Sequence, residues 1–463
     1  MWLKRRYAHA QRKSNMNTPL PSYLLGFAVD GSEQSAFLAN HHMHYVTLEN
    51  GMKILAISGR DPNSAEVEVD IDFATGSYFD EPHPLGAHHF LEHLINKPLR
   101  QLAESLDVGL NASTSYYSLS EHISGPLAPH VPGYGVSALS DQILKRLHDP
   151  TAGYDDLTAV VDSERQVIKN EVDRNQADHS WQARRNLLED VLSEDNPMRI
   201  QTAGTHETLD QITAPTLQRL AASICTPQAV TTHIYNNGKP ARLDPYLAQF
   251  VKAANKWPRR ALARQLDWTL LDKVAVRQHP RFALHDTQLR NEYASICLVW
   301  NHTCLPFSLE SISLNMYMSY LHEKVHEYAR RTGIGYVAYA RSYSLFEQKL
   351  IVIQFDTSKK SGKQLEKLAA DIQKAIRDEL LNVDDKTFEK IVAKAHANHL
   401  ANPIHAQDTL AVAAWGVEHY DTLFDIEKTR AQTLAVTPIQ LDYWVQYLRT
   451  NPPSVVSITA DLS

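Results

Sequence analysis

The segment 87–95 most constrains what this chain can fold into, because it places four charged or polar side chains in an apolar helix-forming stretch. It reads Ala-His-His-Phe-Leu-Glu-His-Leu-Ile, in which His89, Glu92 and His93 form an H-x-x-E-H pattern. On a helix, positions i and i+4 share a face, so both imidazoles can bind one zinc ion, with Glu92 beside them as a proton acceptor. The apolar neighbours indicate burial, which a bound cation would make less costly. The alternative is a chance cluster in a chain with 23 histidines.

A third ligand is expected from an acidic residue on another helix. Leu157, Val161, Glu164, Ile168 and Glu171 follow one another at steps of four and three, which is typical of the core-facing side of an amphipathic helix. Glutamates on that side are unusual unless they meet a cation. The alternative is that both glutamates lie at the edge of the apolar stripe.

Strand and helix patterns occur in the same order in both halves of the chain. Segments 44–58, 65–76, 110–125 and 230–235 indicate strands in the first half, with helical patterns between them. The second half has strand patterns at 294–300, 335–355 and 454–459, and helical patterns at 309–331, 362–399 and 438–448. We therefore expect an α+β fold of two homologous domains, each a mainly antiparallel sheet packed against helices. The expected boundaries are an N-terminal extension at 1–40, a zinc-binding domain at 41–240, a connector at 241–285 and a second domain at 286–463.

Composition excludes several classes of protein. The 46 Lys and Arg against 53 Asp and Glu give a net charge of −7, which argues against a nucleic-acid binder. No apolar run is long enough to span a membrane. Three cysteines without a CxxC motif argue against a disulfide scaffold and favour a reducing compartment. We therefore expect a cytoplasmic protein, with an organelle matrix or the periplasm as alternatives. The basic, acid-poor start lacks the apolar core of a secretory signal, and it fits either a mobile tail ahead of the first strand or an organelle presequence.

Four motifs, in order along the chain, resemble those of one peptidase family. Residues 86–93 resemble the sequence Gly-Leu-Ala-His-Phe-Leu-Glu-His of the pitrilysin and insulin-degrading-enzyme family of inverted-motif zinc peptidases, which includes the mitochondrial processing peptidase. Residues 110–115 resemble its Asn-Ala-x-Thr-Ser strand, Glu164 to Glu171 its paired-glutamate helix, and residues 204–209 its Gly-Thr-x-Glu-x-Leu turn. The resemblance covers nearly the whole chain and implies that it forms half of a clamshell chamber.

The resemblance also implies the roles of individual residues. One zinc ion per chain would be bound by His89, His93 and Glu171, and Glu92 would be the general base. Glu164 would hold one of the ligands or the network of water molecules around the zinc ion. The strand segment Asn111, Ala112 and Ser113 would pair with a peptide substrate by β-augmentation.

The second half carries a partial match to the family's Arg and Tyr pair, which holds the substrate carbonyl. Tyr336 matches the tyrosine, but Ala329 stands at the position of the arginine, and Arg330 is one residue away. Either Arg330 takes over that role or the role is lost.

The leading hypothesis is therefore a zinc metalloendopeptidase that hydrolyses peptides or unfolded segments. One alternative is a catalytic subunit that needs a separate partner, and another is a non-catalytic structural or docking member of the same family. Because the family's chamber has four domains and this chain has two, we expect a homodimer, with a heterodimer as the rival.

Overall fold

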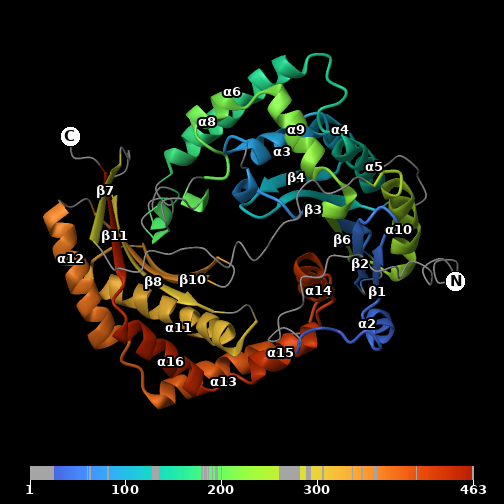
Figure 1. Ribbon diagram of the computed structural model, residues 1–463. Helices are drawn as coiled ribbons and strands as arrows, with labels where there is room; N and C mark the ends of the chain where they lie inside the picture. Colours follow the sequence, from blue (N-terminus) through green and yellow to red (C-terminus); the bar gives the residue numbers. More distant parts are fainter. Residues whose placement is uncertain are drawn as a thin grey trace. The chain divides into compact units, whose positions relative to one another are not determined.

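The computed structural model describes residues 26–460, apart from 60, 62–63, 81–82, 128–134, 179–180, 182–184, 186, 190, 193–196, 200, 260–281, 288–292, 305–306, 336, 346–347, 359–361 and 403. The chain divides into two compact units (Figure 1). The first comprises Met1–Val172, Ile200–Leu266 and Ile404–Ile426, and the second comprises Asp173–Arg199, Asp267–Pro403 and Glu427–Ser463. Among the described residues, no helix is both long and apolar enough to cross a membrane.

The first unit is built on a six-stranded sheet with the order β1-β2-β6-β3-β5-β4. All neighbouring strands are antiparallel except β2 and β6. The strands are β1 (Met43–Thr47), β2 (Lys53–Ser58), β3 (Glu66–Phe73), β4 (Gly109–Thr114), β5 (Leu119–Pro126) and β6 (Val230–Asn236). The helices of the first half of the chain are α2 (Gln34–Asn40), α3 (Ala87–Asn96), α4 (Arg100–Ser105), α5 (Gly135–His148), α6 (Leu157–Gln176), α8 (His206–Gln211), α9 (Ala214–Ile224) and α10 (Pro240–Ala254).

Strand β3 shows how the sequence pattern forms the two faces of this sheet. Val67, Val69, Ile71 and Phe73 are buried in one core with residues of α3, α5, α6, α9 and α10, while the alternate residues point to the opposite face. Because side chains alternate along a strand, the polar residues of β3 lie on the face away from that core.

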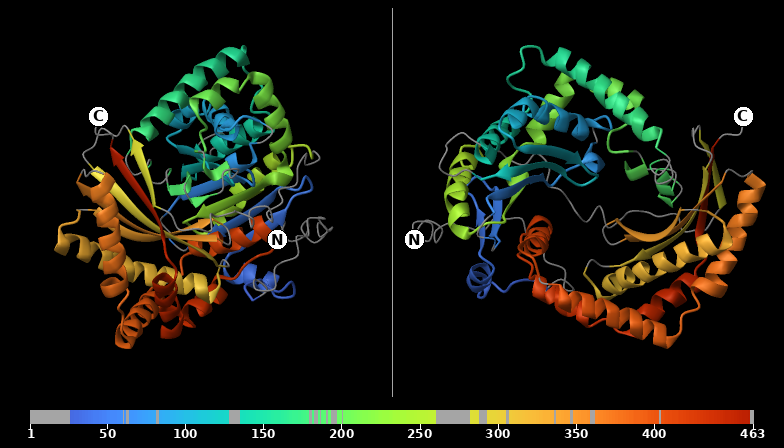
Figure 2. Two further views of the ribbon diagram at one scale, coloured as in Figure 1. Left: turned by 60° about the vertical axis from the view of Figure 1, so that its left-hand side comes forward. Right: turned by 180° about the vertical axis from the view of Figure 1, so that it is seen from behind.

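The second unit contains a five-stranded sheet with the order β7-β11-β8-β10-β9, in which only β7 and β11 are parallel. Its strands are β7 (Phe282–Thr287), β8 (Tyr293–Thr303), β9 (Val337–Leu345), β10 (Gln348–Ser358) and β11 (Ser454–Ala460). The helices α11 (Leu309–Thr332), α12 (Gly362–Ala375), α13 (Asp385–Ala401) and α16 (Pro438–Thr450) contribute to its core (Figure 2), and α15 (Ile426–Leu434) precedes α16 in the chain. The prediction of an α+β fold with mainly antiparallel sheets packed against helices is confirmed.

Two segments lie elsewhere than the sequence patterns suggested. Residues 240–254 form helix α10, and its Leu243, Leu247 and Phe250 lie in the core of the first unit rather than in a connector. Helix α14 (Ala406–Tyr420) comes from the C-terminal half of the chain but packs in the first unit. Its apolar side chains contact β2 on the face opposite α3, in a small core that contains Leu410, Ala413 and Val417. Long-range packing of apolar faces explains both differences, because local periodicity does not specify which sheet a helix covers.

Candidate metal centre

Helix α3, which carries the H-x-x-E-H pattern, starts at a conformation that only glycine adopts readily. Gly86 has φ +94°, and a Cβ atom there would lie 2.6 Å from the carbonyl oxygen of Ala203. The buried carboxylate of Asp80 accepts hydrogen bonds from the backbone N–H groups of Gly86 (2.7 Å) and His88 (3.0 Å). Asp80 thus satisfies N–H groups that a helix start leaves without intrahelical partners.

His88 is occupied by structural contacts and does not join the candidate metal ligands. Its Nδ1 lies 2.6 Å from Asp80 Oδ1, and its Nε2 lies 2.9 Å from Thr75 Oγ1. Of the three histidines on α3, only His89 and His93 are therefore available to bind a metal ion. No sequence pattern pointed to Asp80, which lies seven residues before the first residue of α3.

His89, His93 and Glu171 bring three donor atoms together. The two imidazole rings lie 4.9 Å apart between centroids. Glu171 Oε2, from α6, lies 3.5 Å from His89 Nε2 and 3.7 Å from His93 Nε2. Ligand atoms around a tetrahedral zinc ion lie about 3.3–3.6 Å apart, as follows from bonds of about 2.0–2.2 Å. His89 Nε2 is buried and has no hydrogen-bond partner, so this donor set fits a zinc ion.

Glu164 lies behind one of these histidines rather than among the converging atoms. Its Oε2 lies 3.2 Å from His93 Nδ1, and its other oxygen forms an ion pair with Lys97. The predicted core-facing side of α6 is observed, since Val161, Glu164 and Ile168 are buried and Leu157 and Glu171 are half-buried. The two glutamates of one helix face thus contact opposite edges of the His93 ring.

Glu92 is buried beside the histidines and is held from strand β4. Its Oε2 accepts a hydrogen bond from Thr114 Oγ1 at 2.7 Å and lies 3.5 Å from His89 Nδ1. Thr114 fixes the direction of the carboxylate, and the sequence motif alone did not identify this contact.

The charges of the site favour a cation. Burial disfavours the charged form of His89, but the carboxylates of Glu171 and Glu92 raise its pKa to about 9. Hydrogen bonds to His89 and His93 hold the pKa of Glu171 well below its usual range. Three carboxylates around two imidazoles leave an excess of negative charge that a divalent ion would neutralise.

A second buried carboxyl group, which no sequence pattern indicated, is connected to Glu92 through Asn96. Glu121, on β5, is fully buried, and Asn96 Nδ2 donates to its Oε1 at 3.0 Å and to the carbonyl oxygen of Glu92 at 3.2 Å. Burial, followed by the nearby charge of Glu92, raises the pKa of Glu121 well above its usual range. The alternation of β5 would have shown that this residue points inward, but not what it contacts.

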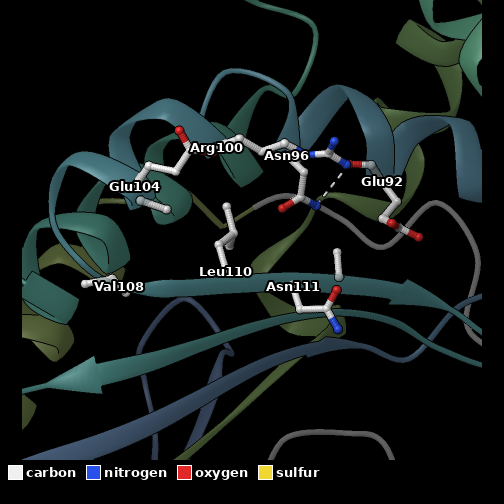
Figure 3. A pocket seen from close by; sticks show the side chains of 9 residues that line it. Glu92, Asn96, Arg100, Glu104, Val108, Leu110 and Asn111 are labelled. Atoms are coloured by element: carbon white, nitrogen blue, oxygen red, sulfur yellow. Dashed lines mark hydrogen bonds between the residues drawn. The ribbon is translucent and has the colours of Figure 1, made fainter.

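A pocket of about 340 Å³ opens between α3, α4 and β4 (Figure 3). Of the residues predicted to bind substrate, Asn111 and Ala112 line this pocket together with Glu92, whereas Ser113 is exposed outside it. The other lining residues are Asn96, Arg100, Ala103, Glu104, Val108 and Leu110. Strand β4 is at the edge of the described sheet, so one side of its backbone is available for pairing.

The described structure does not test the two predicted residues of the second half. Arg330 lies exposed in the last turn of α11, in the second unit. Tyr336 lies outside the described residues. The roles of both residues stay predictions.

Comparison with curated proteins gives one relevant similarity. The chain is 25% identical over 230 residues to the uncharacterized zinc protease YmxG of Bacillus subtilis, and the match spans 46% of this chain and 48% of that protein. The chain thus matches about half the length of this relative. No family model matches the chain.

Solved structures share the fold over nearly the whole chain. The first half of the periplasmic protease PqqL from Escherichia coli has a TM-score of 0.67 at 17% identity, covering 91% of this chain and 92% of that one. The peptidase M16 inactive domain from Pseudomonas fluorescens has a TM-score of 0.69 at 13% identity, covering 91% of this chain and 98% of that one. The sequence similarity to a zinc protease and the fold shared with M16 peptidases support the motif resemblance of this chain to the pitrilysin, or M16, family.

Proposed function

We propose that the protein is a zinc-dependent endopeptidase. The observation that carries the proposal is the meeting of His89 Nε2, His93 Nε2 and Glu171 Oε2, with the carboxylate of Glu92 beside them. Two neutral nitrogens and one carboxylate are a ligand set that leaves a position of zinc open, as catalytic zinc sites require.

His89, His93 and Glu171 would hold the ion, and Glu164 would keep His93 in the tautomer that presents Nε2. A bound zinc ion lowers the pKa of a coordinated water molecule and polarises the substrate carbonyl. Because Glu164 accepts at Nδ1 of His93, the Nε2 lone pair is left free for the ion.

Glu92 would take the proton of the attacking water and deliver it to the leaving amine. The hydrogen bond from Thr114 keeps this carboxylate oriented, and contact with His89 holds its pKa below the usual range despite burial. An ionised carboxylate is the form that accepts a proton. General base catalysis of this kind contributes about 10²- to 10⁴-fold in rate.

The substrate would be a peptide or unfolded segment that pairs with the edge of β4 at Asn111, Ala112 and Ser113. The free edge of β4 and the adjacent pocket support this, since main-chain pairing gives affinity and a pocket next to Glu92 receives a side chain near the cut bond. Arg100 and Glu104 give that pocket both signs of charge.

A complete active site would need a second chain. The full-length PqqL protease of Escherichia coli is about twice as long as the part that this chain matches, since this chain covers 48% of it. This supports assembly of two such chains, as a homodimer or with a related subunit. In either case Tyr336, with Arg330 replacing the displaced arginine, would face the metal centre of the partner. We place the enzyme in the cytoplasm, with an organelle matrix or the periplasm as alternatives.

A non-catalytic role is the second candidate, because the fold is shared with an M16 inactive domain. The complete set of His89, Glu92, His93 and Glu171 favours the peptidase. The test measures zinc content and hydrolysis of a quenched-fluorescent peptide library for three chains: wild type, Glu92→Gln and Glu389→Gln. Glu389, an exposed glutamate on α13 in the second unit, provides the matched control. We expect wild type and the control to cut and Glu92→Gln to bind zinc without cutting. A zinc-loaded wild type that cuts no peptide, alone or with a related subunit, would favour the docking role.

A further inference from the structure

A second group of potential metal ligands lies on the opposite face of the first sheet. It consists of Asp72 on β3, His233 on β6 and Glu418 on α14. The neighbouring residues Ile71 and Ile234 point into the core that contains α3, so the alternating residues Asp72 and His233 point away from it. This group therefore shares no ligand with the centre formed by His89, His93 and Glu171.

The imidazole of His233 lies between the two carboxylates. Its Nδ1 is 3.2 Å from Asp72 Oδ2, and its Nε2 is 2.9 Å from Glu418 Oε1. The three side chains are largely buried, with exposed fractions of 13% for His233, 20% for Asp72 and 25% for Glu418. One donor atom from each residue lies within 4.8 Å of the other two.

The contact between His233 and Glu418 has the distance of a hydrogen bond but not its geometry. Nε2 is buried and has no hydrogen-bond partner, although the carboxylate oxygen is near. Adjacent ligand atoms of a six-coordinate ion with bonds of about 2.0–2.2 Å lie about 2.8–3.1 Å apart, and the observed separation falls in that range. Asp72 at Nδ1 provides the carboxylate contact that commonly orients a metal-binding histidine.

The charge of the group also fits a divalent cation. Two ionised carboxylates and a protonated imidazole carry a net charge of −1, whereas two carboxylates, a neutral imidazole and a divalent ion sum to zero. In a largely buried position the neutral combination has the lower desolvation cost. The partial exposure of Glu418 leaves room for water to complete the coordination.

We propose that Asp72, His233 and Glu418 form a second site for a divalent transition-metal ion, such as zinc, which fastens helix α14 to the sheet of the first unit. Glu418 and His233 Nε2 bind the ion, and Asp72 holds Nδ1. Nitrogen and carboxylate ligands suit zinc, cobalt and manganese better than calcium. The site has a stabilising role because α14 otherwise contacts this sheet mainly through the small core around Leu410 and Val417 and the ion pair of Lys53 with Asp421.

The experiment is a cobalt and zinc titration of the full chain after removal of metals with a chelator. We expect wild type to bind two ions, His93→Ala to keep the second ion, and His233→Asn and Glu418→Gln each to lose it. Glu68→Gln is the matched control, since Glu68 is on the same face of β3 and accepts a hydrogen bond from Gln407 of α14 at 3.0 Å without belonging to the group. This control should bind two ions.

Hydrogen exchange gives a readout that does not depend on activity or on the folding of the variants at the second site. In the His93→Ala chain, added zinc should slow exchange of the α14 amides. The proposal would be overturned if wild type bound a single ion, if His93→Ala lost that ion, and if zinc left α14 exchange unchanged. His233 would then only form ion pairs with Asp72 and Glu418. Two ions retained by both His233→Asn and Glu418→Gln would also overturn it.

Discussion

The two glutamates on α6 should differ in their effect on zinc binding, although they lie on the same helix face. Glu171 Oε2 lies near the Nε2 atoms of both histidines, at 3.5 and 3.7 Å, whereas Glu164 lies 3.2 Å from Nδ1 of His93, on the other edge of that ring. Replacing Glu171 with Gln removes the anionic ligand itself. Replacing Glu164 with Gln keeps an oxygen that can accept from Nδ1 and removes only the charge behind the ring.

The expected magnitudes follow from these positions. Loss of a carboxylate that supports a ligating histidine costs about 10- to 100-fold in metal affinity, or about 1.4–2.8 kcal/mol. We expect Glu164→Gln to weaken zinc binding by a factor in that range. Glu171→Gln should weaken zinc binding by more than about 100-fold, because a charged ligand is lost rather than weakened. Lys97 loses its ion-pair partner in Glu164→Gln, so Lys97→Met is a useful companion variant that removes the same pair from the other side.

The measurement is competition for zinc against a chromogenic chelator near neutral pH, with circular dichroism to verify folding. Glu389→Gln, at an exposed position on α13, serves as the control and should match wild type. Equal losses in Glu164→Gln and Glu171→Gln would refute the division of roles. A larger loss in Glu164→Gln would reverse the two assignments.

Three further predictions concern catalysis, assembly and folding. Glu92→Gln should bind zinc as wild type does and lose about 10²- to 10⁴-fold in turnover, and peptide-hydrolysis rates within a few-fold of wild type would show that Glu92 is not the base. If active sites are shared between two chains, Glu92→Gln and Tyr336→Phe should each be weak alone and regain activity when re-associated, whereas proven mixed dimers without recovery would reject a shared-site homodimer. Gly86→Ala should lower the free energy of unfolding by at least about 1–3 kcal/mol, because alanine disfavours φ +94° and its Cβ would meet the Ala203 carbonyl. Thermal unfolding measures this as a lower midpoint, and an unchanged midpoint would contradict the prediction.

Local sequence patterns were sufficient for many of the helices and strands and for placing the H-x-x-E-H residues on one helix. The alternation at 67–73 predicted strand β3 and its buried face, and this is observed. The spacing of His89, Glu92 and His93 predicted one helix face, and the steps along α6 predicted that Glu164 faces inward. These features depend on the periodicity of a single helix or strand, which is fixed by backbone geometry and can be read from neighbouring residues.

Only the tertiary structure decided how distant residues meet. The residues alone left open which glutamate of α6 is a ligand, and the packing of α6 against α3 directs Glu171 to the Nε2 atoms and Glu164 to Nδ1 of His93. Asp80, Thr114 and Glu121 reach α3 from other segments, and α14 returns to the first sheet from the C-terminal half. Such contacts depend on how whole faces pack and on where buried polar groups find partners, and no local period in the sequence encodes that choice.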